Sequence, residues 1–358
     1  MMKILVINPG STSTKLAVFE DEKLSWQGSA RHCAEDLAPF HHVNEQYEYR
    51  KACVYRLLAE AGIHLMFDAV IARGGLLKPT PGGVYAINEQ MKYDLLHARM
   101  EHACNLGALI ADEIAGKCGC PAYIADPEVV DELQDCARLT GIPEIERISI
   151  FHALNSKAVS RRYAAQMGKQ YEDLNLIVAH LGGGISVGAH CKGRVIDVNN
   201  ALNGEGPFSP ERAGTVPGGQ LAELCFSGKY TLSEVKQLLN GKGGLVAYLG
   251  TTDVVTISEK AIKGEELYKR VLDAMIYTVA KQVGAMYVSL RGQVDAIILT
   301  GGIAYNAYCV DLLCGQIDYL APIVMMPGED EMGSLAFNAL GALKGEILLK
   351  VYCPEFSS

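Results

Sequence analysis

Two short segments of this chain repeat one pattern, in which an apolar strand enters a turn of small residues and an alternating second strand leaves it. The first turn lies within residues 8–15, Asn-Pro-Gly-Ser-Thr-Ser-Thr-Lys, and the second within residues 180–186, His-Leu-Gly-Gly-Gly-Ile-Ser. Turns with so little side-chain bulk let backbone N–H groups point at phosphate oxygens, and the hydroxyls and Lys15 add further donors. The repeat therefore predicts a duplicated hairpin that binds phosphate.

A better-known phosphate-binding sequence is absent. No Gly-x-x-x-x-Gly-Lys-Ser/Thr segment occurs, which excludes a P-loop, and the predicted geometry is strand-turn-strand rather than strand-turn-helix. One glycine-rich hairpin is weak evidence, since tight turns outnumber phosphate sites. Two of them on separate halves, with a later apolar strand that ends in Gly301-Gly302, make a much stronger case.

Length and composition limit the class of protein. A chain of 358 residues with 49% hydrophobic residues suits two domains, each with its own core. The 11 cysteines include no Cys-x-x-Cys pair, which argues against a zinc site and a secreted disulfide framework. A net charge of −9 argues against a nucleic-acid partner, and the lack of a long apolar run argues against membrane or signal segments. We therefore expect a cytoplasmic enzyme whose anionic substrate meets clustered cations or a metal ion.

Strands and helices alternate along the chain, which predicts an α/β fold. We expect a hairpin over residues 3–20 and strands over residues 65–72, 122–125, 174–179 and 295–300. Helices are expected over residues 91–117, 156–167 and 265–290. A final helix, about 331–350, has no strand predicted after it and is expected to pack back on the first domain. The predicted domains are residues 1–150 and 151–330.

The three glycine-rich elements together resemble the superfamily of actin, sugar kinases and heat-shock chaperone ATPases. The resemblance implies a duplicated actin-like ATPase (ribonuclease H-like) fold, with a nucleotide cleft between two domains that closes over its substrates. It also implies that the first hairpin contacts the β- and γ-phosphates, the second the other phosphates, and the Gly-Gly strand end the adenosine. The nucleotide-binding residues implied are Gly10, Ser11, Thr12, Ser13, Lys15, His180, Gly182, Gly183, Gly184, Gly301, Gly302 and Ile303.

Within this superfamily the chain is most similar to the acetate and butyrate kinase family. Further matching segments run in order along nearly the whole chain, at residues 72–79, 150–155, 206–214, 250–254 and 327–332. The resemblance implies reversible transfer of the γ-phosphoryl group of ATP to a short-chain carboxylate, giving an acyl phosphate and ADP. The stretch at residues 73–79 favours butyrate or a similar short or branched-chain acid, with acetate and propionate as the alternatives.

The implied acceptor explains why Asn8 stands where sugar kinases have Asp. A carboxylate is already ionised at pH 7, so it needs no general base, and an aspartate would repel it. Transfer needs alignment and neutralisation of charge on the phosphoryl oxygens. Carried over from the family motifs, Asn8 would contact the phosphoryl group, and His152, His180 and Arg212 would stabilise it.

The same motifs imply residues for the acid and for a metal ion. Asp126 and Glu331 would organise Mg²⁺ with ATP or ADP, directly or through water. Arg73 is assigned to the substrate carboxylate, although the acetate-kinase pattern would put that arginine at Val70. The resemblance also implies a homo-oligomer.

Several of these residues have structural alternatives. His180 and His152 are alternatively packing residues, and Arg73 and Arg212 ordinary ion-pair partners. Asp126 before Pro127 is alternatively a helix N-cap. Glu329, Asp330 and Glu331 are alternatively the acidic start of a helix. His41 and His42 match no motif and are expected in a surface loop.

A rival of another class is an actin-like or chaperone-type ATPase without a carboxylate acceptor. Chaperones of this kind carry a peptide-binding domain after the ATPase, whereas few residues follow residue 329 here. Filament subunits should polymerise with nucleotide. These properties distinguish the rival from a carboxylate kinase.

Overall fold

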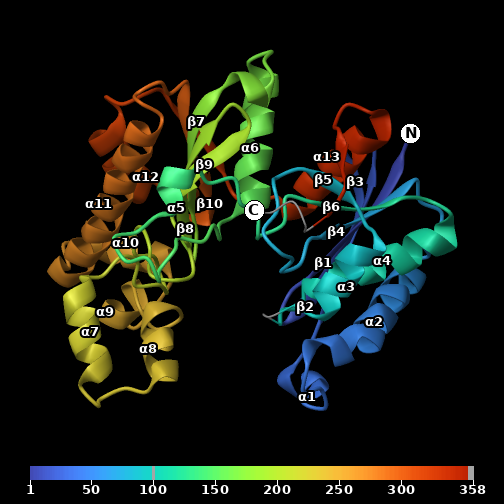
Figure 1. Cartoon of the computed structure of the whole chain (residues 1–358), viewed down its shortest axis with the longest axis horizontal. Helices are drawn as coiled ribbons and strands as arrows, with labels where there is room; N and C mark the ends of the chain where they lie inside the picture. The colour runs from blue at the N-terminus through green and yellow to red at the C-terminus, as the bar shows by residue number, and fades with distance from the viewer. Residues whose placement is uncertain (99–100, 354–358) are drawn as a thin grey trace. The chain divides into compact units, whose positions relative to one another are not determined.

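The computed structural model describes residues 1–98 and 101–353. Contacts divide the chain into two compact units, Met1–Val130 with the chain from Asp330 onward, and Asp131–Glu329. Each unit contains one β-sheet with helices packed on it (Figure 1). Within the described residues, every helix is too short or too polar to cross a membrane.

The first unit combines the N-terminal part of the chain with its last helix and strand. Its elements are β1 (Lys3–Pro9), β2 (Ser13–Glu20), β3 (Lys23–Arg31), α1 (Ala34–Leu37), η1 (Val43–Gln46), α2 (Tyr47–Glu60), β4 (Ala69–Arg73), β5 (Val84–Ala86), α3 (Glu89–Leu96), α4 (Asn105–Cys118), β6 (Ala122–Ala125), α13 (Glu331–Lys344) and β12 (Leu349–Lys350).

The sheet of this unit has the order β12-β5-β6-β4-β1-β2-β3. β1, β2 and β3 form an antiparallel meander, and β1, β4 and β6 run parallel. Alternate residues such as Leu5 and Ile7 pack with α2 and α4 on one face. Ile4 and Val6 are equally buried on the other face, and α13 packs against β1 and β4. Burial on both faces explains why the β1 sequence is a continuous apolar run.

The second unit has the same alternation of strands and helices. Its elements are α5 (Asp135–Arg138), α6 (Ala153–Gln166), η2 (Tyr171–Asp173), β7 (Asn175–Leu181), β8 (Ile185–Cys191), β9 (Arg194–Val198), α7 (Gly218–Phe226), α8 (Leu232–Leu239), α9 (Leu245–Leu249), α10 (Val254–Ile262), α11 (Glu266–Ser289), β10 (Ala296–Gly301), η3 (Gly302–Tyr305), α12 (Ala307–Ile317) and β11 (Ile323–Pro327).

The sheet of the second unit has the order β11-β10-β7-β8-β9, and both its faces are buried. Ile177 and Ala179 pack with the apolar stripe of α11, the helix predicted over residues 265–290. The intervening residues Leu176 and Val178 pack with α6 instead. The single strand β7 therefore contributes to two cores.

The two sheets share one topology, which confirms the predicted duplicated fold. The run β3-β2-β1-β4-β6 in the first unit corresponds to β9-β8-β7-β10-β11 in the second, each an antiparallel meander followed by two parallel strands. Both glycine-rich turns therefore join the first two strands of a meander. In such sheets ligands bind beyond the carboxyl ends of the parallel strands, where these turns lie.

Three expected elements differ in the structure. The helix predicted over residues 91–117 is two helices, α3 and α4, and residues 99–100 lie outside the described chain. The strand predicted over residues 65–72 begins at Ala69. The prediction that no strand follows the last helix is wrong. Gly345, with φ of 72°, ends α13, and Leu349 of β12 then pairs with Val84 of β5.

The division by contacts falls at Val130, before the expected boundary at residue 150. The segment between these positions lies against β9 of the second unit. Glu132 Oε2 accepts a hydrogen bond from Val195 N at 2.8 Å, and Gln134 N donates to Ile196 O at 3.0 Å. These backbone contacts attach the segment to a strand far along the sequence, which composition alone does not reveal.

Candidate active site

The first glycine-rich turn, residues 10–12, is closed by the backbone and leaves its side chains exposed. Gly10 N donates to Ser13 O at 2.7 Å, and Thr12 O accepts from His32 N at 2.9 Å. Ser11, Thr12 and Lys15 are exposed, and Lys15 stands directly opposite Asn8 in the hairpin register. Opposed residues in an antiparallel pair point to the same face of the sheet. Lys15 and Asn8 therefore share one face beside the turn.

Asn8 belongs to a charged cluster in the first unit. Its side chain is 4% exposed, and Nδ2 donates to Glu331 Oε2 at 2.7 Å. Glu331 Oε1 lies 2.6 Å from Nη1 of Arg73, whose Nη2 also pairs with Glu128. The structure thus brings together the predicted residues Asn8, Arg73 and Glu331, and adds Glu128, which was not predicted.

The three consecutive acids at the start of α13 have different environments. Asp330 is the N-cap, and its Oδ1 accepts from Gly333 N at 2.8 Å. Glu329 is exposed. Glu331 is bonded to Asn8 and Arg73.

Asp126 lies at the carboxyl end of β6 and is 1% exposed. The alternative that it caps a helix is wrong, because the next helix starts only at Asp135. Asp126 instead exchanges two hydrogen bonds with Gly83, from Asp126 N to Gly83 O at 2.9 Å and from Gly83 N to Asp126 Oδ1 at 2.7 Å. Its backbone has φ of 37°, an unusual value for a residue with a side chain. These bonds fix the carboxylate at the strand end.

His180 is buried in the second unit, with 2% of its surface exposed. Burial, and secondarily the charge of Arg212, lower the pKa of His180 to about 4, so the ring is neutral at pH 7. Asn155 Nδ2 lies 2.9 Å from His180 Nδ1 and also donates to Thr300 Oγ1 at 3.0 Å. With Nδ1 as acceptor, the proton resides on Nε2. That N–H faces the second glycine-rich turn, because a Cβ built on Gly182 would lie 3.2 Å from Nε2.

His152 stacks on His180. The ring centroids are 3.8 Å apart and the planes are inclined by 10°. His152 Nδ1 lies 2.9 Å from Ser186 Oγ, and Ser186 stands opposite His180 in the hairpin register. His152 precedes α6 as its N-cap residue, so its position follows from the start of that helix. The two predicted histidines therefore form one unit beside the second turn.

Arg212 reaches the same turn from the loop between β9 and α7. Nη1 donates to Ala201 O at 2.9 Å and Nε donates to Asn240 Oδ1 at 3.2 Å. A Cβ built on Gly184 would lie 1.7 Å from Nη1, so the guanidinium occupies the space that a side chain at position 184 would take. The second turn therefore has a cation beside it, and Gly184 is required for that contact.

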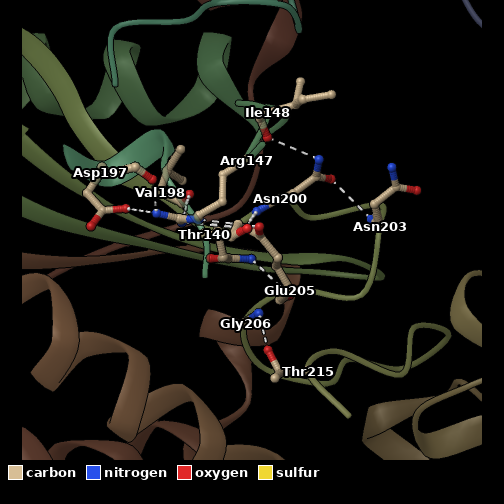
Figure 2. Close-up of polar contacts among 12 residues, drawn as sticks. Thr140, Arg147, Ile148, Asp197, Val198, Asn200, Asn203, Glu205, Gly206 and Thr215 are labelled. Carbon is tan, nitrogen blue, oxygen red and sulfur yellow. Dashed lines mark hydrogen bonds and ion pairs between the residues drawn. The ribbon is translucent and has the colours of Figure 1, made fainter. Parts of the chain in front are cut away.

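The loop that carries Arg212 is anchored by the polar network of Figure 2. Arg147 Nη1 pairs with Asp197 at 2.9 Å, and its Nε pairs with Glu205 at 3.3 Å. Glu205 Oε2 also accepts from Asn200 N at 2.8 Å, and Thr215 Oγ1 accepts from Gly206 N at 2.9 Å. None of these residues was predicted as a site residue, although Gly206 begins the matching segment 206–214.

Gly301 stands at the end of β10, where the sequence predicts a strand end. Its φ is 85°, and a Cβ there would lie 2.4 Å from Leu181 O. Gly301 and Gly328 exchange backbone hydrogen bonds of 3.1 and 2.9 Å, which tie the ends of β10 and β11 together. Gly302 is exposed and Ile303 is buried within η3.

Two units of one topology, each with a glycine-rich turn in its first hairpin, define the duplicated actin-like fold. The model of the Acetokinase family matches residues 144–322. The chain is 80% identical to a protein named probable butyrate kinase from Phocaeicola vulgatus, covering 99% of this chain and 100% of the relative. It is 51% identical to butyrate kinase 2 of Clostridium acetobutylicum, covering 98% and 99%. The chain belongs to the acetokinase family.

Solved structures agree with this fold. The acetate kinase of Porphyromonas gingivalis superposes with a TM-score of 0.80 at 20% identity, covering 96% of this chain and 100% of the other. A propionate kinase from Francisella tularensis gives a TM-score of 0.73 at 19% identity, covering 94% and 99%. At such identities the likeness concerns the fold.

Proposed function

We propose that the protein is a carboxylate kinase that transfers the γ-phosphoryl group of ATP reversibly to butyrate or a similar short or branched-chain acid. The observation that carries the proposal is the cluster of Asn8, Glu331 and Arg73, in which an uncharged amide and a guanidinium stand beside the first turn. The names of the relatives support butyrate as the acid.

The chemistry requires no proton transfer to start. A carboxylate oxygen attacks the γ-phosphorus, the bond from phosphorus to the β,γ-bridging oxygen breaks, and the electron pair stays on ADP. Asn8 contributes a neutral hydrogen-bond donor to the phosphoryl group, whereas a carboxylate there would repel the incoming acid. Arg73 binds the acid, since its planar guanidinium suits a carboxylate in two-point contact.

The residues of the second unit stabilise charge on the transferring group. His180 acts as a neutral donor through Nε2–H, and Arg212 acts as a fixed cation beside Gly184. His152 contributes from the stacked position, where Ser186 orients its ring. Preorganised donors of this kind are worth roughly two to three powers of ten in rate.

The nucleotide contacts follow the two turns and the end of β10. Residues Gly10, Ser11, Thr12, Ser13 and Lys15 are assigned to the terminal phosphates. The turn at residues 182–184 and His180 are assigned to the remaining phosphates, and residues 301–303 to the adenosine.

Asp126 and Glu331 suit Mg²⁺ that is bound together with the nucleotide. Within residues 1–98 and 101–353, no group of three or more acidic, histidine or cysteine side chains is placed to hold a metal alone. Mg²⁺ commonly binds through one or two carboxylates plus substrate phosphates, and both residues offer carboxylate oxygens. When bound, it neutralises charge on the phosphate oxygens. Asp126 and Glu331 would hold the ion, directly or through water, and Arg73 would bind the acid.

The proposal is tested by the initial rate of acyl phosphate formation, trapped as hydroxamate, with acetate, propionate, butyrate and isobutyrate. We expect the highest kcat/KM for butyrate or isobutyrate, because one methylene in an apolar pocket is worth about 1–3 kcal/mol. A preference for acetate would instead identify an acetate kinase. ATP turnover that ignores every acid, with nucleotide-dependent filaments, would identify the rival ATPase.

The substrate assignment has its own test at position 73. Arg73→Lys should raise KM for the acid far more than KM for ATP, because the acid loses its two-point contact. Arg138→Lys is a matched control, since Arg138 pairs with Asp131 and belongs to none of the groups described above. Equal changes in both KM values would exclude the assignment.

We also propose a homo-oligomer in the cytoplasm, where ATP is available. In the described chain α7 buries none of its residues, and Phe226 is 92% and Tyr248 67% exposed. A cavity of about 550 Å³ lies beside Tyr248 and Arg270. Light scattering coupled to size exclusion tests the proposal, and a monomer at assay concentration would contradict it.

A further inference from the structure

Arg50 is a nearly fully buried arginine beneath the first glycine-rich turn. It lies on α2, and 1% of its surface is exposed. Nη1 donates to Gly10 O at 2.9 Å and to Thr14 Oγ1 at 3.2 Å, and Nη2 donates to Ser11 O at 3.2 Å. Nε donates to Gln46 Oε1 at 2.9 Å. The guanidinium thus binds two successive carbonyl groups of the turn.

All four partners of Arg50 are uncharged. Within the described part of the chain, no ion pair includes Arg50, whereas the other buried cation, Lys157, pairs with Glu132 at 2.9 Å. A buried charge without a counter-charge is costly, so proteins rarely keep one without a use for it. Burial also lowers the pKa of the Arg50 guanidinium from its usual value.

The network of Arg50 continues through Thr14 to His32. Thr14 Oγ1 accepts from Arg50 and lies 2.8 Å from His32 Nε2, within hydrogen-bond distance. Burial, and secondarily the charge of Arg50, lower the pKa of His32 from its usual value, which favours the neutral ring. Within the described chain, Arg50 itself therefore has no carboxylate partner beneath the turn.

The bonds from Arg50 also fix the direction of two peptide groups. In a trans peptide, the C=O of one residue and the N–H of the next point in opposite directions. Because Gly10 O and Ser11 O point at Arg50, the N–H groups of Ser11 and Thr12 point away from it. In the described structure neither N–H has a hydrogen-bond acceptor within the chain. Two successive free N–H groups form a concave anion site.

We propose that Arg50 is the positioning residue of the first turn. Arg50 aims the N–H groups of Ser11 and Thr12 at the terminal phosphates of the nucleotide. From beneath the turn, it also supplies a positive charge that attracts those phosphates. The inference rests on the proposed function and adds a residue that does not touch the substrate. The inference predicts that replacing Arg50 weakens ligand binding more strongly as the number of phosphates in the ligand rises. Adenosine has no phosphate group, so its affinity should not change.

The test is calorimetric titration of adenosine, AMP, ADP and ATP, with Mg²⁺, into the wild-type protein and into Arg50→Gln. Arg56→Gln is the matched control, because Arg56 lies on the same helix with a side chain 63% exposed. We expect Arg50→Gln to weaken ATP binding by about tenfold or more and ADP binding less, with adenosine unchanged. Arg56→Gln should resemble the wild type.

Two results separate this inference from the proposed function. If the wild-type protein binds no ATP, the proposed function fails. If the wild type binds ATP, two results exclude the role of Arg50: Arg50→Gln lowers the affinity for all four ligands equally, or it lowers none of them. If Arg50→Gln does not fold, the same titrations with Arg50→Lys test the inference. A lysine keeps the positive charge but cannot bind both Gly10 O and Ser11 O. It should weaken ATP but not adenosine, and unchanged ATP affinity would overturn the inference.

Discussion

Arg212 occupies the space above Gly184, where a Cβ would lie 1.7 Å from Nη1 of the guanidinium. Gly184→Ala should therefore displace Arg212 rather than unfold the chain, since the atom in conflict is the flexible end of a side chain. We expect kcat to fall by about a hundredfold, as for a lost charge-stabilising group. The unfolding free energy should fall by about 1–3 kcal/mol, because the displaced Arg212 loses its hydrogen bonds to Ala201 O and Asn240 Oδ1.

Gly183→Ala provides the comparison for this prediction. A Cβ on Gly183 would lie 3.6 Å from Glu211 Oε1, an ordinary contact distance. Its effect on kcat should be clearly smaller than that of Gly184→Ala. If the two substitutions lower kcat equally, the alanine acts by disturbing the backbone of the turn and not by displacing Arg212.

Asn8→Asp tests the requirement for a neutral donor beside the first turn. The new carboxylate would face Glu331, whose Oε2 now accepts from Asn8 Nδ2 at 2.7 Å. Two carboxylates at this distance repel each other and the incoming acid. We expect kcat/KM for the acid to fall by about a hundredfold or more. Asn8→Ser, which keeps a neutral donor, should lose less, and the reverse order would contradict the assignment.

Histidine burial predicts that the second unit is sensitive to acid. His180 has a pKa of about 4 in the folded chain against 6.5 when exposed, and the pKa of fully buried His190 is also lowered. The unfolded state binds more protons in this interval, so stability falls as pH drops from 6.5 towards 4. His180 alone accounts for about 3 kcal/mol over that window.

Urea unfolding followed by circular dichroism across this interval measures the effect. His180→Asn should have a shallower dependence of unfolding free energy on pH than the wild type. The exposed residue His41 gives the matched control His41→Asn, which should keep the full dependence. Parallel curves for all three proteins would show that His180 is not held neutral by the fold.

The buried pair of Lys157 and Glu132 should contribute to stability only as a pair. The side chains are 2% and 6% exposed, and the charged atoms are 2.9 Å apart. Lys157→Met removes the Lys157 cation from beside the buried Glu132 carboxylate, which costs about 3–5 kcal/mol. Adding Glu132→Gln removes that charge and keeps an acceptor for Val195 N, so the double variant should recover part of the loss. A double variant less stable than the single one would contradict this account.

The sequence predicts those parts of the fold that local chemistry determines. Both turns, the apolar stripe of α11 and the Gly301 strand end follow from residue size and periodicity, and all three are present. The predictions fail where distant segments decide the outcome. β12 is a strand only because β5 offers it an edge, and Asp126 is held by Gly83 rather than by a helix.

The candidate site divides in the same way. Asn8, Arg73 and Glu331 lie in recognisable motifs, and they prove to be bonded to one another. Asn155 lies in the same motif as His152, so its position next to His180 had a sequence signal that was not used. Arg50 and Arg147 have no local signal, because a single arginine in a helix or loop becomes significant only through the distant backbone that it binds.

The fate of the γ-phosphoryl group tests the central claim most directly. Phosphorus NMR of the wild-type protein with Mg²⁺, ATP and butyrate should show the γ-phosphate signal replaced by that of an acyl phosphate, while ATP stays largely intact without the acid. Release of inorganic phosphate at the same rate with and without butyrate, and no acyl phosphate signal, would contradict the account.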